Sequence, residues 1–177
     1  MKQMQVVKAF AILMTGTIEA YGERRVVVSL PDHKMVVLED SHIVKMYPVA
    51  VGKSTTPSPT GTFEIINRVQ NPTWFSPGKV VGPGKSNPLG TRWMGLSRKG
   101  YGIHGTNVPS SIGKSASHGC IRMRKQDVED LFEIVTVGDK VELLAEVPAE
   151  LKPVFEGATE IPQQIASSGI ANAGGVQ

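Results

Sequence analysis

The segment His104–Met123 reads HGTNVPSSIGKSASHGCIRM, and the rest of the chain is best understood as the scaffold that presents it. It holds the only cysteine of the 177 residues, Cys120, and two of the four histidines, His104 and His118. A lone thiol cannot form an internal disulfide, so Cys120 serves either packing or chemistry. Free cysteine usually behaves as a small buried apolar residue, but the Ser-His-Gly before Cys120 is typical of a turn that presents a side chain. We therefore interpret Cys120 as a catalytic nucleophile.

A cysteine nucleophile needs a base and a site for the oxyanion. The reactive form is the thiolate, so a base must lie close to the sulfur. His104 can reach Cys120 across a loop, and His118 stays open as an alternative, because residues two apart in an extended chain face the same side. A tight turn would aim the backbone N–H groups of Gly119 and Cys120 at one point, which predicts an oxyanion hole. Together these parts indicate acyl transfer through a thioester.

Composition and charge are those of one ordinary globular domain. Apolar residues make up 40% of the chain and charged residues 20%, and the length allows a sizeable buried core. The formal net charge is +3, with lysine and arginine scattered rather than clustered, so we expect no nucleic-acid partner. The longest apolar run, residues 9–18, is too short to span a bilayer, so we expect no integral membrane segment.

The two ends of the chain differ from its middle. Residues 1–20 resemble a secretory signal peptide, with Lys2 and Lys8 before and at the start of the apolar run and Ala20 at a cleavage point. The alternative is a first strand or helix of the mature fold. Residues 146–177 lack periodicity and are rich in Pro, Gly, Ala and Ser, which predicts a disordered tail.

The middle of the chain consists mainly of short β-branched runs separated by turn residues. Strands are predicted at residues 25–30, 35–40, 42–52, 62–69, 92–97, 101–106 and 140–144. Apolar residues recur with a helical period only in residues 126–135, directly after the nucleophile. The sequence therefore predicts a mainly β domain, a sandwich or distorted barrel with one short helix.

Residues 71–90 are predicted to form a long loop rich in proline and glycine. Loops of this length inside a compact domain are uncommon and are usually functional or mobile. Trp74 and Phe75 lie within it, and either cover the core or line a cleft.

Four blocks in order resemble the catalytic domain of the L,D-transpeptidases, the YkuD-type family of bacterial cell-wall enzymes. They are GKSTTPSPTGTFEI (52–65), NPLGTRWMGLS (87–97), GYGIHGTN (100–107) and SHGCIRM (117–123). The resemblance covers about residues 25–144 and places a catalytic domain at 24–145. It implies the same mainly β fold, with Cys120 as nucleophile and His104 as base. It also implies that the carbonyl of Gly105 holds the imidazole tautomer, as Asp does in a serine triad.

The remaining predicted site residues surround this pair. Ser117, His118 and Gly119 are predicted to shape the site, and Asn107 to bind substrate. Arg122 is either a structural hydrogen-bond hub or a clamp for a substrate carboxylate, which arginine binds in a bidentate manner.

By the resemblance, the substrate is a peptidoglycan stem peptide. The thiolate would attack the diamino acid carbonyl at its bond to the terminal D-Ala, and an amine would take the acyl group. We expect an exported monomer in the periplasm or cell wall, no cofactor, and acylation by carbapenems. Three alternatives stay open: hydrolysis by the same site, as an L,D-carboxypeptidase or a cross-link-cleaving enzyme; a non-catalytic wall-binding module; and a zinc site made of His104, His118 and Cys120.

Overall fold

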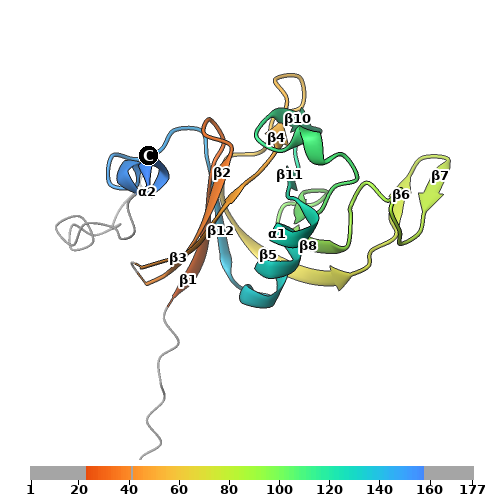
Figure 1. Cartoon of the computed structure of the whole chain (residues 1–177), viewed down its shortest axis with the longest axis horizontal. Coiled ribbons are helices and arrows are strands. Elements are labelled where there is room, and N and C mark those ends of the chain that lie inside the picture. The colour runs from red at the N-terminus through yellow and green to blue at the C-terminus, as the bar shows by residue number, and fades with distance from the viewer. Residues whose placement is uncertain (1–22, 41, 158–177) are drawn as a thin grey trace, which may run out of the picture.

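The computed structural model describes residues 23–40 and 42–157 (Figure 1). The predicted signal peptide and residues 158–177 of the predicted tail lie outside this part of the chain, so export stays a prediction. No helix within the described ranges is long and apolar enough to cross a membrane.

The fold is built on one curled, eight-stranded sheet with the strand order β11-β9-β8-β5-β12-β1-β2-β3. Its strands are β1 (Arg24–Ser29), β2 (Lys34–Glu39), β3 (His42–Pro48), β5 (Gly61–Gln70), β8 (Arg92–Leu96), β9 (Gly102–His104), β11 (Ile121–Arg122) and β12 (Lys140–Leu144). Two short ladders flank the sheet, β4 (Val51–Gly52) with β10 (Ser115–Ser117) and β6 (Trp74–Ser76) with β7 (Lys79–Val81). The helices are α1 (Lys125–Ile134), α2 (Lys152–Glu156) and the 3₁₀ turn η1 (Pro109–Ser111). The predicted mainly β class is confirmed.

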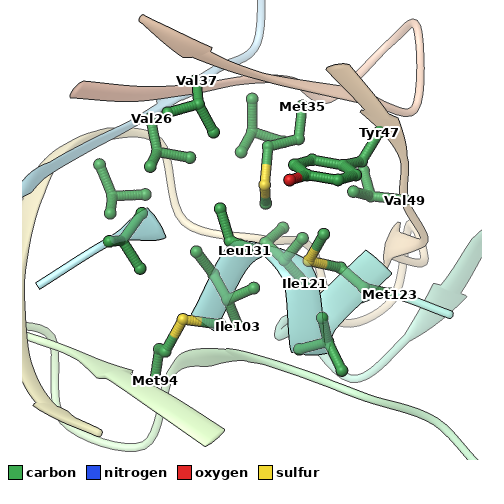
Figure 2. Close-up of a cluster of buried hydrophobic side chains, with 14 of the residues drawn as sticks. Val26, Met35, Val37, Tyr47, Val49, Met94, Ile103, Ile121, Met123 and Leu131 are labelled. Atoms are coloured by element: carbon green, nitrogen blue, oxygen red, sulfur yellow. The ribbon is translucent and has the colours of Figure 1, made fainter. Parts of the chain in front are cut away.

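The main core lies inside the curl of the sheet (Figure 2). Val26 and Met35 enter it from the first hairpin, and Ile103 and Ile121 enter it from the opposite end of the sheet. Leu131 of α1 lies between these groups and has no exposed surface. The helix after the nucleophile thus joins both ends of the sheet through one core, which fixes β9 and β11 in place.

A second core lies on the other face of the first hairpin. Val27 and Leu38 point to this face because successive strand residues alternate sides, and both are at most 1% exposed. Leu151, Val154 and Phe155 of the C-terminal segment cover them. The hairpin is therefore buried on both faces, which explains its continuous apolar runs.

The predicted disordered tail is wrong for residues 146–157. This segment carries α2, whose Phe155 carbonyl accepts a hydrogen bond from Lys34 Nζ at 2.7 Å. Gly157 ends the helix with φ 111°, a left-handed value that favours glycine. Helix α2 has only five residues, KPVFE, too few for a helical period of apolar residues to be seen in the sequence.

We predict that Phe155→Ala lowers the free energy of unfolding by about 3 kcal/mol, the usual cost of truncating a buried aromatic side chain. Phe155 is 4% exposed, whereas Val137, at 59% exposed, provides a matched surface control as Val137→Ala. Urea unfolding followed by circular dichroism measures both. An unchanged midpoint in Phe155→Ala would mean that α2 does not belong to the folded domain.

Candidate active site

The parallel pairing of β9 with β11 brings the predicted base and nucleophile to one place. Ile103 is paired with Ile121, and His104 with Arg122. Because side chains alternate, the two isoleucines enter the core while His104 and Arg122 take the opposite face. Cys120 directly precedes β11, two residues from Arg122, and therefore belongs to that same face.

This face opens into a cleft of about 1060 Å³. His104, Cys120, Arg122, Ser117, His118 and Asn107 line it on the side of the sheet, with Asn67 and Trp93 beside them. The other lining residues are mainly apolar. Val69 on β5 is paired with Trp93, and Pro72, Trp74, Phe75, Val81, Pro88 and Leu89 belong to the segment 71–90. The prediction that Trp74 and Phe75 either cover the core or line a cleft is resolved in favour of the cleft.

The imidazole of His104 is held in one tautomer. Its Nδ1 lies 2.6 Å from the carbonyl oxygen of Gly105. A carbonyl can only accept, so Nδ1 carries the proton and Nε2 is left with its lone pair. The backbone of Gly105 packs closely against that of Gly90, since a Cβ on Gly90 would lie 2.8 Å from the Gly105 Cα. The predicted contact between the Gly105 carbonyl and the His104 imidazole is present.

Burial keeps the base and the thiol uncharged. Burial lowers the pKa of His104 to about 4, and the positive charge of the Arg122 guanidinium contributes to this lowering. The hydrogen bond to the Gly105 carbonyl acts in the opposite direction and raises the pKa. Burial also raises the pKa of the Cys120 thiol above its ordinary value, although the Gly102 N–H and Arg122 act to lower it. The resting site at neutral pH therefore holds a neutral imidazole and a protonated thiol rather than an ion pair.

The turn before Cys120 is closed by Ser117, whose side chain is almost fully buried. Its hydroxyl donates to the Cys120 carbonyl at 2.6 Å and accepts the N–H of Gly119 at 2.9 Å. Gly119 has φ +114°, and a Cβ there would lie 2.6 Å from a ring carbon of Tyr101, so only glycine fits. The predicted site-shaping roles of Ser117 and Gly119 agree with this geometry.

The predicted oxyanion hole needs a correction at one donor. The Gly119 N–H is bound to the Ser117 hydroxyl and does not point at an incoming substrate. The sequence could not show this, because a Ser-x-Gly turn can use the serine hydroxyl either as acceptor or as a surface group. The Cys120 N–H is the donor of this turn that remains next to the sulfur.

Arg122 and Asn107, the two predicted substrate-binding residues, differ in whether other protein groups bind their side chains. Among the described residues, no hydrogen bond or ion pair engages the Arg122 guanidinium, which favours the carboxylate clamp over the structural hub. Asn107 donates from Nδ2 to the Ser86 carbonyl at 3.1 Å and also lines the cleft, so its contact with substrate stays a prediction. His118 is exposed in the turn.

The zinc alternative finds no support in the geometry. Within residues 23–40 and 42–157, no three His, Cys, Asp or Glu side chains gather closely enough to hold a metal ion. His104, His118 and Cys120 share a cleft without forming such a group.

The family model for the L,D-transpeptidase catalytic domain matches residues 23–143. The chain belongs to this family. An L,D-transpeptidase YkuD of Bacillus licheniformis is 44% identical over 119 residues, covering 67% of this chain and 64% of the relative. This chain thus spans slightly less than two thirds of that protein.

Solved L,D-transpeptidase structures share the fold. A crystal structure of an Enterococcus faecium L,D-transpeptidase mutant superimposes with a TM-score of 0.60 at 25% identity, covering 70% of this chain and 50% of the other. The L,D-transpeptidase LdtMt1, solved in complex with imipenem, gives a TM-score of 0.58 at 23% identity, with coverages of 70% and 59%.

Asn87 is one residue of this L,D-transpeptidase domain that sequence reasoning missed. It is fully buried, and its Nδ2 donates to the carbonyls of Pro72, Val81 and Gly82 at 2.7, 3.2 and 3.1 Å. These carbonyls flank the β6–β7 hairpin, which we call the arm (residues 73–82) and which extends away from the body in Figure 1. The only sequence signal was an Asn-Pro pair, which indicates a turn but not a hub.

We predict that iodoacetamide alkylates Cys120 at a rate that rises continuously from about pH 7 to about pH 9, because the raised thiol pKa leaves little thiolate at neutral pH. Mass spectrometry of the Cys120 peptide measures the rate, and His104→Gln serves as control, in which the rise should persist. A plateau around neutral pH in the unaltered protein would instead indicate a preformed thiolate–imidazolium pair.

Proposed function

We propose that this chain is a peptidoglycan L,D-transpeptidase that works through a thioester on Cys120. The observation that carries the proposal is the Nδ1–H tautomer of His104, which leaves Nε2 as a proton acceptor in the cleft that also contains the only cysteine. Membership of the family supplies the reaction class.

The first half-reaction acylates the enzyme. His104 Nε2 takes the thiol proton as Sγ bonds to the carbonyl carbon that precedes the terminal D-Ala of a stem tetrapeptide. The tetrahedral intermediate then collapses, the C–N bond breaks, and the proton on Nε2 passes to the departing amine. Because burial disfavours the charged imidazole, protonated His104 gives up its proton readily to this amine.

The second half-reaction transfers the acyl group. An amine from another stem attacks the thioester, loses a proton to Nε2, and the thiolate leaves and is reprotonated. Two groups of the protein stabilise the negative charges of the reaction. The Cys120 N–H faces the developing oxyanion, and Arg122 binds a substrate carboxylate while stabilising the thiolate.

We predict that incubation with a carbapenem adds the mass of one drug molecule to the protein, on the peptide that contains Cys120. Carbapenems carry a strained amide that a thiolate can open, and LdtMt1 has been solved with imipenem bound. Intact-mass spectrometry measures the adduct. Incubation of the protein with a disaccharide-tetrapeptide, followed by mass analysis of the products, shows whether a cross-linked product forms. Cys120→Ala should lose both while keeping its circular dichroism. An adduct or product that persists in Cys120→Ala would remove the thioester mechanism.

We predict that His104→Gln slows carbapenem acylation by about 10²–10⁴-fold, the usual loss on removing a general base. His118→Ala should slow it far less, because His118 is exposed and no hydrogen bond among the described residues orients its ring as the Gly105 carbonyl orients that of His104. Stopped-flow or quenched mass measurements give both rates. The reverse order would assign the base to His118.

A further inference from the structure

The base has a second neighbour besides Gly105. Trp93 on β8 is register-paired with His104 on β9, so both side chains take the same face of the sheet. Their ring centroids are 5.7 Å apart and the planes lie within 25° of parallel, which is a stacked arrangement. The Gly105 hydrogen bond fixes which nitrogen carries the proton, and the indole limits how far the imidazole can tilt.

The backbone beneath the indole is shaped to accept it. Gly102 stands two residues before His104, and a Cβ there would lie 2.6 Å from the Trp93 ring. Gly95, paired directly opposite Gly102 on β8, would bring a Cβ to 2.6 Å from the Asn67 amide. Two facing glycines therefore leave a shallow trough, and the indole and the amide lie in it.

Asn67 fixes the orientation of the indole. It lies on β5 opposite Gly95, and its Oδ1 accepts a hydrogen bond from Trp93 Nε1 at 3.1 Å. The indole N–H has only donor capacity, so this bond sets one ring orientation. The contacts run in series from Asn67 to Trp93 to His104, and both outer members line the cleft.

We propose that Trp93 is a positioning residue for His104, and that Asn67 acts on the base through Trp93. The indole holds the imidazole in one rotamer, with Nε2 available in the cleft that contains the thiol, and it excludes water from the face of the ring that it covers. This rests on the proposed role of His104 as base. Proton transfer depends steeply on geometry, and a displacement of about 1 Å can cost about 10²-fold in rate.

The test compares Trp93→Leu, Trp93→Phe and Asn67→Ala in the full chain. Carbapenem acylation of Cys120 should slow about 10- to 100-fold in Trp93→Leu, less in Asn67→Ala, and least in Trp93→Phe, which keeps an aromatic ring. In a His104→Gln background, Trp93→Leu should cause no further loss. A further loss of similar size there would show that Trp93 acts on the substrate directly and would overturn the proposal.

A second readout is independent of activity. In nitrogen-15 spectra of the histidine rings, the His104 signals should be sharp in the unaltered protein and should broaden in Trp93→Leu, where the imidazole is free to tilt, while the Gly105 carbonyl keeps the proton on Nδ1 in both. Trp74→Leu is the matched control, because Trp74 lies on the arm, and it should leave the His104 signals unchanged. His104 signals as sharp in Trp93→Leu as in the unaltered protein would overturn the positioning role. If the unaltered protein forms no adduct at Cys120, the proposed function fails, and these spectra still decide the role of Trp93. Thermal unfolding confirms that each variant is folded.

Discussion

The pairing of β9 with β11 is the constraint on which the site depends. It is a parallel contact of two very short strands, made by segments that a polar loop separates in sequence. Two short parallel strands are weak alone, and this pair is held because Ile103 and Ile121 are fully buried against α1. The same register that buries the isoleucines places His104 beside Arg122 on the cleft side. Packing and catalytic geometry are thus set by one alignment, and a slip of one residue would exchange the two faces.

Burial gives the site its electrostatic character. A histidine and a cysteine in water would exchange a proton easily near neutral pH, whereas here the pKa of the imidazole falls and that of the thiol rises. Both shifts favour the uncharged forms, so charge develops only as the substrate reacts. Arg122 is the fixed positive charge near both groups, and it favours the thiolate over the imidazolium.

Much of this architecture could be predicted from the sequence. The β-branched runs between turn residues predicted every strand of the main sheet except the two-residue β11, and the i, i+3, i+4 pattern predicted α1. The lone cysteine, together with the resemblance, gave Cys120, His104 and Gly105 as the candidate centre, and the structure gathers them in one place. These features are local in sequence or carried by a recognisable motif.

The remaining features depend on contacts that no local pattern encodes. Helix α2 forms because the hairpin offers an apolar face, and the β6–β7 arm forms inside residues predicted as a loop. The hydrogen bond from Gly119 to Ser117, and the use of Asn107 to bind Ser86, are choices between partners that the sequence presents equally. A role for Trp93 at the site could not be predicted until its pairing with His104 was known.

The Asn87 hub has a consequence for how this domain can diversify. The Asn87 side chain ties the two ends of the arm together by binding carbonyls at both of them. The strands of the main sheet therefore do not depend on which residues the tip of the arm contains. The tip exposes Phe75 and Val80, at 72% and 65%, and contributes no residue to either core. Substitutions at the tip are therefore expected to change the free energy of unfolding little. The wall of the cleft formed by the arm can change in what it binds without disturbing the wall that holds the thiol and the imidazole.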